Sequence, residues 1–177
     1  MRLFKECPRI LGDRNISNAV TIPARYPPRV TAIRLVKRII NNPVKEIGWL
    51  PAYSHGTRTH FPDWLNRFTT PQKVFHWHGE TFELPAESTQ LLSSQHCENQ
   101  AFLYKDNVLA FQCHIEMTES MVDEWSLLYE DELLQPSDTI QTRAEMQAGS
   151  VQYIDQLNKL ADEIYQNWIG QLGTSAS

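Results

Sequence analysis

The sequence predicts an α/β fold, because short apolar strands occupy its middle and amphipathic helices occupy its last third. The strand signal is strongest at residues 108–113, the most apolar segment of the chain, which follows a tight turn at 105–107. The helix signal is strongest at 150–169, where apolar side chains recur every three or four residues. A chain of 177 residues, 41% hydrophobic and 21% charged, is long enough for one globular domain with one core.

The folded pattern begins at the turn signal Asn41–Pro43. Residues 44–50 alternate partly between polar and apolar side chains, which predicts the first strand. Residues 54–72 are polar with spaced aromatic side chains, which predicts a short helix that packs on one face. The next predicted strand covers 74–78, and Gly79 is expected to end it.

Two further strands are predicted at 90–94 and 101–104, before the apolar strand at 108–113. Thr118 is suited to cap a helix that runs to about residue 134, because its hydroxyl can accept a hydrogen bond from a free backbone N–H. The apolar stripe at 150–169 predicts a last helix that packs on the core.

The distribution of charge divides the chain near residue 40. Residues 1–40 carry nine basic and two acidic side chains, a net charge of +7, whereas the rest carries seven basic and nineteen acidic, a net charge of −12. Four prolines in the basic part limit regular structure. We therefore predict a basic, Pro-containing segment at 1–40 that is unrelated to the domain, a domain at 41–170, and a disordered tail at 171–177.

Three interpretations of residues 1–40 stay open. The segment is a disordered basic arm, an Arg-rich transit peptide against which its prolines count, or a stretch translated out of frame. The last interpretation makes the chain a truncated or frame-disrupted copy of a longer domain.

Composition also excludes several classes of protein. The net charge of −5 argues against a nucleic-acid binder. No apolar run approaches the roughly 20 residues of a membrane span, so no membrane partner is expected. Cys7, Cys97 and Cys113 are odd in number, widely spaced and without a CxxC pair, which makes a reducing cytoplasm the expected location.

The first chemical candidate is the pair His114 and Glu116 at the end of the most apolar strand. In extended backbone, side chains two residues apart point to the same face. Glu116 can therefore hold the His114 imidazole in one tautomer and stabilise its charged form, as a general base requires. On its own, such a pair is more often a surface ion pair than a catalytic one.

The second candidate is the H-x-H pair His76 and His78, whose rings alternate onto one face of the predicted strand. With Glu83 five residues later, the spacing is that of cupin-type metal sites, and His96 or His114 would complete the ligand set. The lack of a Gly/Pro turn before either histidine counts against this alternative. The simpler interpretation of His76 is a hydrogen-bonded core histidine.

Four segments together resemble one family. Residues 111–118 (F-Q-C-H-I-E-M-T) resemble the F-Q-x-H-x-E motif of class I glutamine amidotransferases, and 76–82 (H-W-H-G-E-T-F) resemble the loop that precedes this motif. Residues 42–49 and 97–102 resemble the stand-alone, GMP-synthase-like branch. The segments occur in the family's order and cover about residues 41–135.

The resemblance implies the C-terminal part of a doubly wound, flavodoxin-like α/β domain that lacks its N-terminal strands. The family hydrolyses the amide of glutamine to glutamate and ammonia with a Cys-His-Glu triad, in which His114 and Glu116 would be the catalytic His and Glu. It implies glutamine as the substrate, no cofactor and no metal. A glutamine-binding role falls on four consecutive residues: His76, Trp77, His78 and Gly79.

The family's nucleophile is missing from this sequence. It stands in a G-x-C-x-G elbow, and no cysteine here is flanked by glycines in that pattern. We therefore expect little or no glutaminase activity from the chain as written. The alternative is a non-catalytic remnant or binding protein. The absent strands would also leave a sheet edge exposed, which invites a partner chain or self-association.

Overall fold

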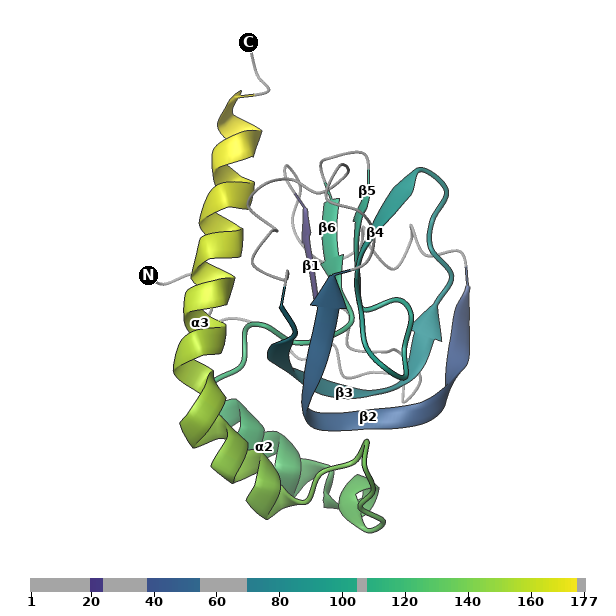
Figure 1. The fold of residues 1–177 in the computed structure, drawn as a ribbon, viewed down its shortest axis with the longest axis vertical. Coiled ribbons are helices and arrows are strands. Elements are labelled where there is room, and N and C mark those ends of the chain that lie inside the picture. Colours follow the sequence, from purple (N-terminus) through teal and green to yellow (C-terminus); the bar gives the residue numbers. More distant parts are fainter. Residues whose placement is uncertain (1–19, 24–37, 55–69, 105–107, 175–177) are drawn as a thin grey trace.

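The strands in the described part of the chain form one antiparallel sheet in the order β1-β6-β5-β4-β2-β3. The computed structural model describes residues 20–23, 38–54, 70–104 and 108–174. Together with the helices, the sheet confirms the predicted mixture of strands and helices. The parallel pairs of a doubly wound sheet do not occur among these described strands, so the part of the fold seen in Figure 1 is antiparallel.

Two long strands curve around the base of the sheet (Figure 1). They are β2 (Ile39–Ser54) and β3 (Gln72–Phe82), and both extend beyond their predicted bounds. Their pairing continues to Ile39 opposite Phe82, after a register shift between Asn41 and Glu46. The prediction that Gly79 ends the strand is wrong, because the β2 ladder holds the backbone extended on both sides of it.

The next three strands form a meander near their predicted positions: β4 (Ser88–Ser93), β5 (Ala101–Tyr104) and β6 (Val108–Phe111). A further strand that the sequence did not predict, β1 (Val20–Pro23), pairs with β6. Apart from these four residues and residues 38–40, the segment 1–40 lies outside the described residues. The predicted boundary at residue 40 stays a prediction, as does the tail at 171–177.

The first helix begins where the sequence predicted. In α2 (Glu119–Leu128), the Thr118 hydroxyl accepts a hydrogen bond of 3.2 Å from the Met121 backbone N–H. The helix ends at Leu128, and a 3-10 turn, η3 (Glu130–Leu133), takes the place of the last turns expected. Most of the short helix predicted at 54–72 lies outside the described residues.

The last helix, α3 (Arg143–Thr174), begins seven residues earlier than predicted. Its start is a capping box. The Thr142 hydroxyl accepts from the Glu145 N–H at 3.3 Å, and the Glu145 carboxylate accepts from the Thr142 N–H at 2.7 Å. The hydrogen bonds that the Glu145 carboxylate accepts from the Thr142 N–H and hydroxyl lower the pKa of Glu145. The T-x-x-E signal is present in the sequence, but it precedes the apolar stripe on which the prediction depended.

The main core lies between one face of the sheet and the helices α2 and α3 (Figure 1). Trp49, Phe75 and Trp168 are among its largest fully buried side chains. Phe82 and Phe102 belong to a second, smaller cluster, as the alternation of side chains across a sheet requires. Among the described helices, none combines the length and the apolar character that crossing a membrane requires.

Candidate functional site

The segment after β6 leaves the sheet and then attaches to the outer edge of β3. His114 donates its backbone N–H to the Phe75 carbonyl at 2.7 Å and accepts from the Phe75 N–H at 3.2 Å. The regular strand stops at Phe111, two residues short of its predicted end. The two backbone hydrogen bonds with Phe75 therefore fix His114 against β3, although His114 lies outside β6.

His114 and Glu116 are in direct contact. The Nδ1 atom of His114 lies 2.7 Å from Oε1 of Glu116, and the His114 residue is 1% exposed. A carboxylate only accepts hydrogen bonds, so Nδ1 carries the proton and Nε2 of the neutral ring carries the lone pair. That Nε2 atom is buried and has no hydrogen-bond partner among the described residues.

Two neighbours hold this pair in place. Burial opposes the charged form of Glu116, but the His114 imidazole and nearby backbone N–H groups outweigh it and lower the pKa of the carboxyl. The ring of Trp125, on α2, meets the His114 ring edge to face, with centroids 5.0 Å apart and an interplanar angle of 90°. The imidazole is thus fixed in orientation while its Nε2 lone pair is left free.

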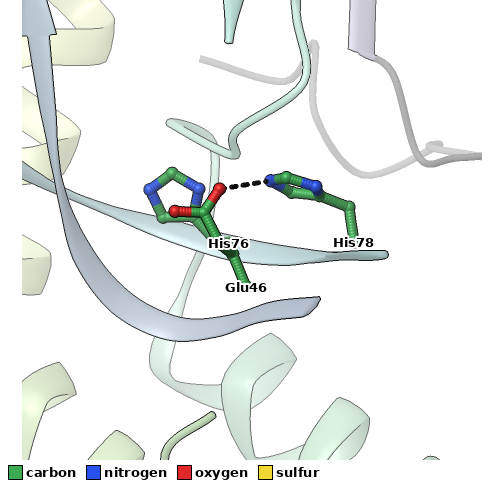
Figure 2. Close-up of side chains that lie close together, drawn as sticks. All are labelled: Glu46, His76 and His78. Carbon is green, nitrogen blue, oxygen red and sulfur yellow. Dashed lines mark ion pairs between the residues drawn. The ribbon is translucent and has the colours of Figure 1, made fainter. Parts of the chain in front are cut away.

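A second group of ionisable side chains lies on β2 and β3 (Figure 2). Glu46, His76 and His78 are all buried, and each offers one possible ligand atom within 4.8 Å of the others. Glu46 and His78 are direct partners across the antiparallel pair, and the Nε2 atom of His78 lies 3.4 Å from Oε2 of Glu46. Figure 2 shows the Glu46 carboxylate beside both rings.

Two polar side chains support this group. Ser94 donates its hydroxyl to Oε2 of Glu46 at 2.9 Å. The amide nitrogen of Gln100 donates to the same oxygen at 2.8 Å and to Nε2 of His78 at 3.1 Å. Burial opposes the charged form of Glu46, but His78, His76 and Ser94 together lower the pKa of its carboxyl.

The four residues predicted to bind glutamine are divided between the two faces of β3. His76 and His78 join Glu46. Trp77 points to the core, where its ring centroid lies 6.1 Å from that of Trp125 and its Nε1 donates to Glu132 at 3.2 Å. Gly79 is half-buried. Trp77 and His114 therefore contact the same tryptophan, which brings two of the predicted site residues close to each other.

The ligand set predicted for a cupin-type site is wrong. Glu83 is exposed and lies 3.8 Å from the guanidinium of Arg38, and His114 is paired with Glu116. The acidic partner of the H-x-H pair is instead Glu46. Sequence reasoning missed this residue, although an acidic residue on the buried face of a predicted strand was the available signal.

Neither cysteine with described side-chain contacts is suited to be a nucleophile. Burial raises the pKa of both the Cys97 and the Cys113 thiol. Cys97 donates to the Thr81 hydroxyl at 3.2 Å, and Cys113 is completely buried. Cys7 lies outside the described residues. The described part of the chain thus supplies a positioned base, His114, but no thiolate nucleophile for it to act with.

Comparisons with known proteins place these features in a family context. No family model matches the chain. It is 31% identical over 129 residues to the glutamine amidotransferase-like protein YfeJ of Salmonella typhimurium, an alignment that covers 71% of this chain and 54% of that protein.

Solved structures give the same result. A glutamine amidotransferase from Methylobacillus flagellatus matches with a TM-score of 0.67 and 32% identity, over 75% of this chain and 55% of that one. A glutamine amidotransferase from Thermotoga maritima matches with a TM-score of 0.62 and 25% identity, over 75% and 54%. The chain spans about half the length of these proteins. The predicted fold class, a partial class I amidotransferase domain, is confirmed.

Proposed function

We propose that this chain carries the His–Glu half of a glutamine-hydrolysing site. The proposal rests on its similarity to part of the glutamine amidotransferase domain. The observation that supports this proposal is the state of His114. Its Nδ1 is held by Glu116 at 2.7 Å, and its buried Nε2 has no partner among the described residues.

The proposed chemistry uses that free nitrogen. A cysteine thiolate attacks the side-chain amide carbon of glutamine, and the protonated Nε2 of His114 gives its proton to the departing ammonia. His114 then takes a proton from the water that cleaves the glutamyl thioester. Glu116 acts as a positioning residue, because it fixes the tautomer of His114 and stabilises the imidazolium that forms at each step.

The nucleophile is the part of the reaction that this sequence does not supply. It contains no G-x-C-x-G elbow, and burial keeps Cys97 and Cys113 in the thiol form. Loss of a nucleophile typically lowers the rate by several orders of magnitude. We therefore propose that this polypeptide releases little or no ammonia by itself, and that activity requires a nucleophile from outside residues 1–177.

Glutamine is the proposed substrate, and residues 76–79 are the proposed segment that contacts it. The contact that Trp77 and His114 share with Trp125 supports this placement. His76 and Trp77 are buried, so this segment would present its backbone to the substrate. No nucleic acid, membrane or cofactor enters the proposal, and a cytoplasmic location stays a prediction. A non-catalytic remnant that binds a partner or nothing is the second candidate, favoured by the missing nucleophile.

The state of His114 can be tested by nitrogen-15 NMR of the histidine rings at neutral to mildly alkaline pH. We expect Nδ1 of His114 to carry the proton, with a downfield N–H resonance that Glu116→Gln moves upfield. The matched control is Glu119→Gln, which removes an exposed carboxylate at the start of α2. A His114 ring protonated at Nε2 in the unsubstituted protein would contradict the proposed role of Glu116.

Two further parts of the proposal, the lack of activity and the contact with glutamine, are tested by adding glutamine and measuring ammonia release and ring resonances. We expect no release above the uncatalysed rate, together with a change in the Trp77 and His114 resonances when glutamine is added. Ammonia release that His114→Ala abolishes would disprove the proposed need for a nucleophile from outside residues 1–177. If the Trp77 and His114 resonances do not change at high glutamine concentration, the glutamine site is disproved and the non-catalytic remnant is the candidate that stays.

A further inference from the structure

His76 is a buried histidine whose ring nitrogens are poorly satisfied by the described residues. It is completely buried, neither Nδ1 nor Nε2 makes a hydrogen bond of good geometry there, and the Leu50 backbone is the one hydrogen-bonding group that acts on its pKa. A buried polar group without a hydrogen bond costs free energy, so native proteins nearly always pair it. The absence of a well-placed partner is therefore a sign that something else binds there.

His78 presents a lone pair to the same place. Its Nδ1 lies 3.1 Å from the Glu80 carbonyl, which can only accept, so Nδ1 carries the proton. Nε2 then has its lone pair directed toward Glu46, at 3.4 Å. Histidines that bind metals show the same arrangement, because a carbonyl that accepts from one ring nitrogen orients the other toward the ion.

Glu46 places a negative charge between these rings. Its residue is 1% exposed, so the carboxylate is removed from solvent. Ser94 and Gln100 donate to its Oε2 and fix its orientation. A buried carboxylate normally needs a compensating positive charge.

We propose that Glu46, His76 and His78 bind a divalent transition-metal cation, most naturally Zn²⁺. Two imidazoles and one carboxylate suit Zn²⁺, whereas Mg²⁺ and Ca²⁺ prefer sites made of oxygen alone. The cation supplies the positive charge that compensates the buried Glu46 carboxylate, and it gives the His76 ring a partner. His76 and His78 also belong to the segment proposed above to contact glutamine, but they would bind the metal through their rings and glutamine through their backbone.

The geometry requires only a small closure. Zn–ligand bonds of about 2.0–2.2 Å place tetrahedral ligands roughly 3.4 Å apart. The His78 Nε2 and Glu46 Oε2 atoms already lie at 3.4 Å, and one possible ligand atom of His76 lies within 4.8 Å of one from each of the other two residues. The His76 ring would therefore move by on the order of 1.5 Å or less, which a side-chain rotation provides.

Gln100 explains how the group is held without a cation. Its amide N–H₂ donates to both Glu46 and His78, so it presents partial positive charge between two acceptors. Its own Oε1 is buried and has no hydrogen-bond partner among the described residues. Rotation of the amide would turn this oxygen toward the ion as a fourth ligand, and both acceptors would then bind the metal.

Cobalt spectroscopy on the full chain tests the proposal, because tetrahedral Co²⁺ absorbs visible light strongly and Co²⁺ replaces Zn²⁺ readily. After treatment with a chelator, we expect one equivalent of Co²⁺ to give a visible band that Zn²⁺ removes. His76→Gln and Glu46→Gln should each weaken binding by roughly 100-fold or more, and Ser94→Ala by about 10–100-fold, as for lost second partners of metal ligands.

The matched control is His96→Gln, which removes a half-buried histidine that does not belong to the group and should leave the band unchanged. Ring resonances in the unsubstituted protein guard against variants that fail to fold: Zn²⁺ should shift those of His76 and His78 and not that of His96. No visible band with Co²⁺, or a band that persists in both His76→Gln and Glu46→Gln, would overturn the proposal. Because the readout is metal binding, the result does not depend on whether the chain releases ammonia.

Discussion

At the scale of single residues, two histidines on neighbouring segments differ in their surroundings. Burial first, and then the electrostatic interaction with His78, lowers the pKa of His76 to about 3. His114 has instead a carboxylate at 2.7 Å. The sequence placed His114 and Glu116 together because extended backbone turns side chains two residues apart to the same face. It could not place Glu46 beside His78, because that contact depends on the register of two strands.

Acid should destabilise the protein through His76. Its pKa is near 6.5 in the unfolded chain and about 3 in the folded one. Between these values the unfolded chain binds more protons, so the free energy of unfolding falls as the pH decreases, by at most about 1.4 kcal/mol per pH unit. We expect His76→Gln to reduce this slope between pH 6 and pH 4, measured by urea unfolding with a chelator present.

His96→Gln is the control for that experiment, because it removes a half-buried histidine outside the group. Its slope should match that of the unsubstituted protein. The carboxyls of Glu46 and Glu116, whose pKa values are lowered, lose their contribution only at lower pH, as the pH falls through their folded values. Equal slopes for His76→Gln and the unsubstituted protein would show that His76 binds protons when folded.

At the scale of elements, the contact between α3 and β2 depends on one glycine. The indole of Trp49 lies over Gly149, and its Nε1 donates to the Met146 carbonyl at 2.9 Å, one turn earlier in the helix. A Cβ at Gly149 would lie 2.9 Å from Cγ of Trp49, which is closer than atoms pack. Because the sequence shows only a glycine in a helical pattern, this close approach is visible only in the structure.

Gly149→Ala should therefore destabilise the protein, although alanine favours helices over glycine by about 1 kcal/mol. Overpacking in a well-packed core costs about 1–3 kcal/mol, and here the neighbour is a buried ring held by a hydrogen bond. We expect a net loss of about 1–2 kcal/mol in the free energy of unfolding, measured in urea. Gln152→Ala, at an exposed site of the same helix, should change it by less than about 0.5 kcal/mol. A more stable Gly149→Ala would show that Trp49 can move.

At the scale of the whole molecule, the sheet has two outer strands. Among the described strands, β1 and β3 each pair on one side only, and residues near His114 cover part of the free side of β3. The chain spans about half the length of its relatives, so strands that their longer domains supply can lie beyond the segments seen here. An uncovered strand edge offers backbone donors and acceptors to another chain.

We expect the purified chain to associate as its concentration rises, measured as molar mass by light scattering after gel filtration. Edge pairing uses backbone hydrogen bonds, so the mass should change little when the salt concentration is raised. Attraction between the basic residues 1–40 and the acidic remainder would instead weaken with salt, because ions screen exposed charges. A constant monomer mass, or dissociation by salt, would rule out the sheet edge as the interface.

The features that could be predicted from the sequence are those that depend on neighbours along the chain. These are the helix start at Thr118, the strands near 101–104 and 108–111, and the motif that carries His114 and Glu116. Each depends on side chains a few residues apart, where periodicity and capping act directly.

Three features follow from contacts between distant segments and could not be predicted from the sequence. They are the length of β2 and β3, the antiparallel order of the described sheet and the contact of Glu46 with the two histidines. The physical reason is that strand register is set by pairing between distant segments. A slip of one residue would turn Glu46 to the opposite face of the sheet, and no local pattern specifies which register is adopted.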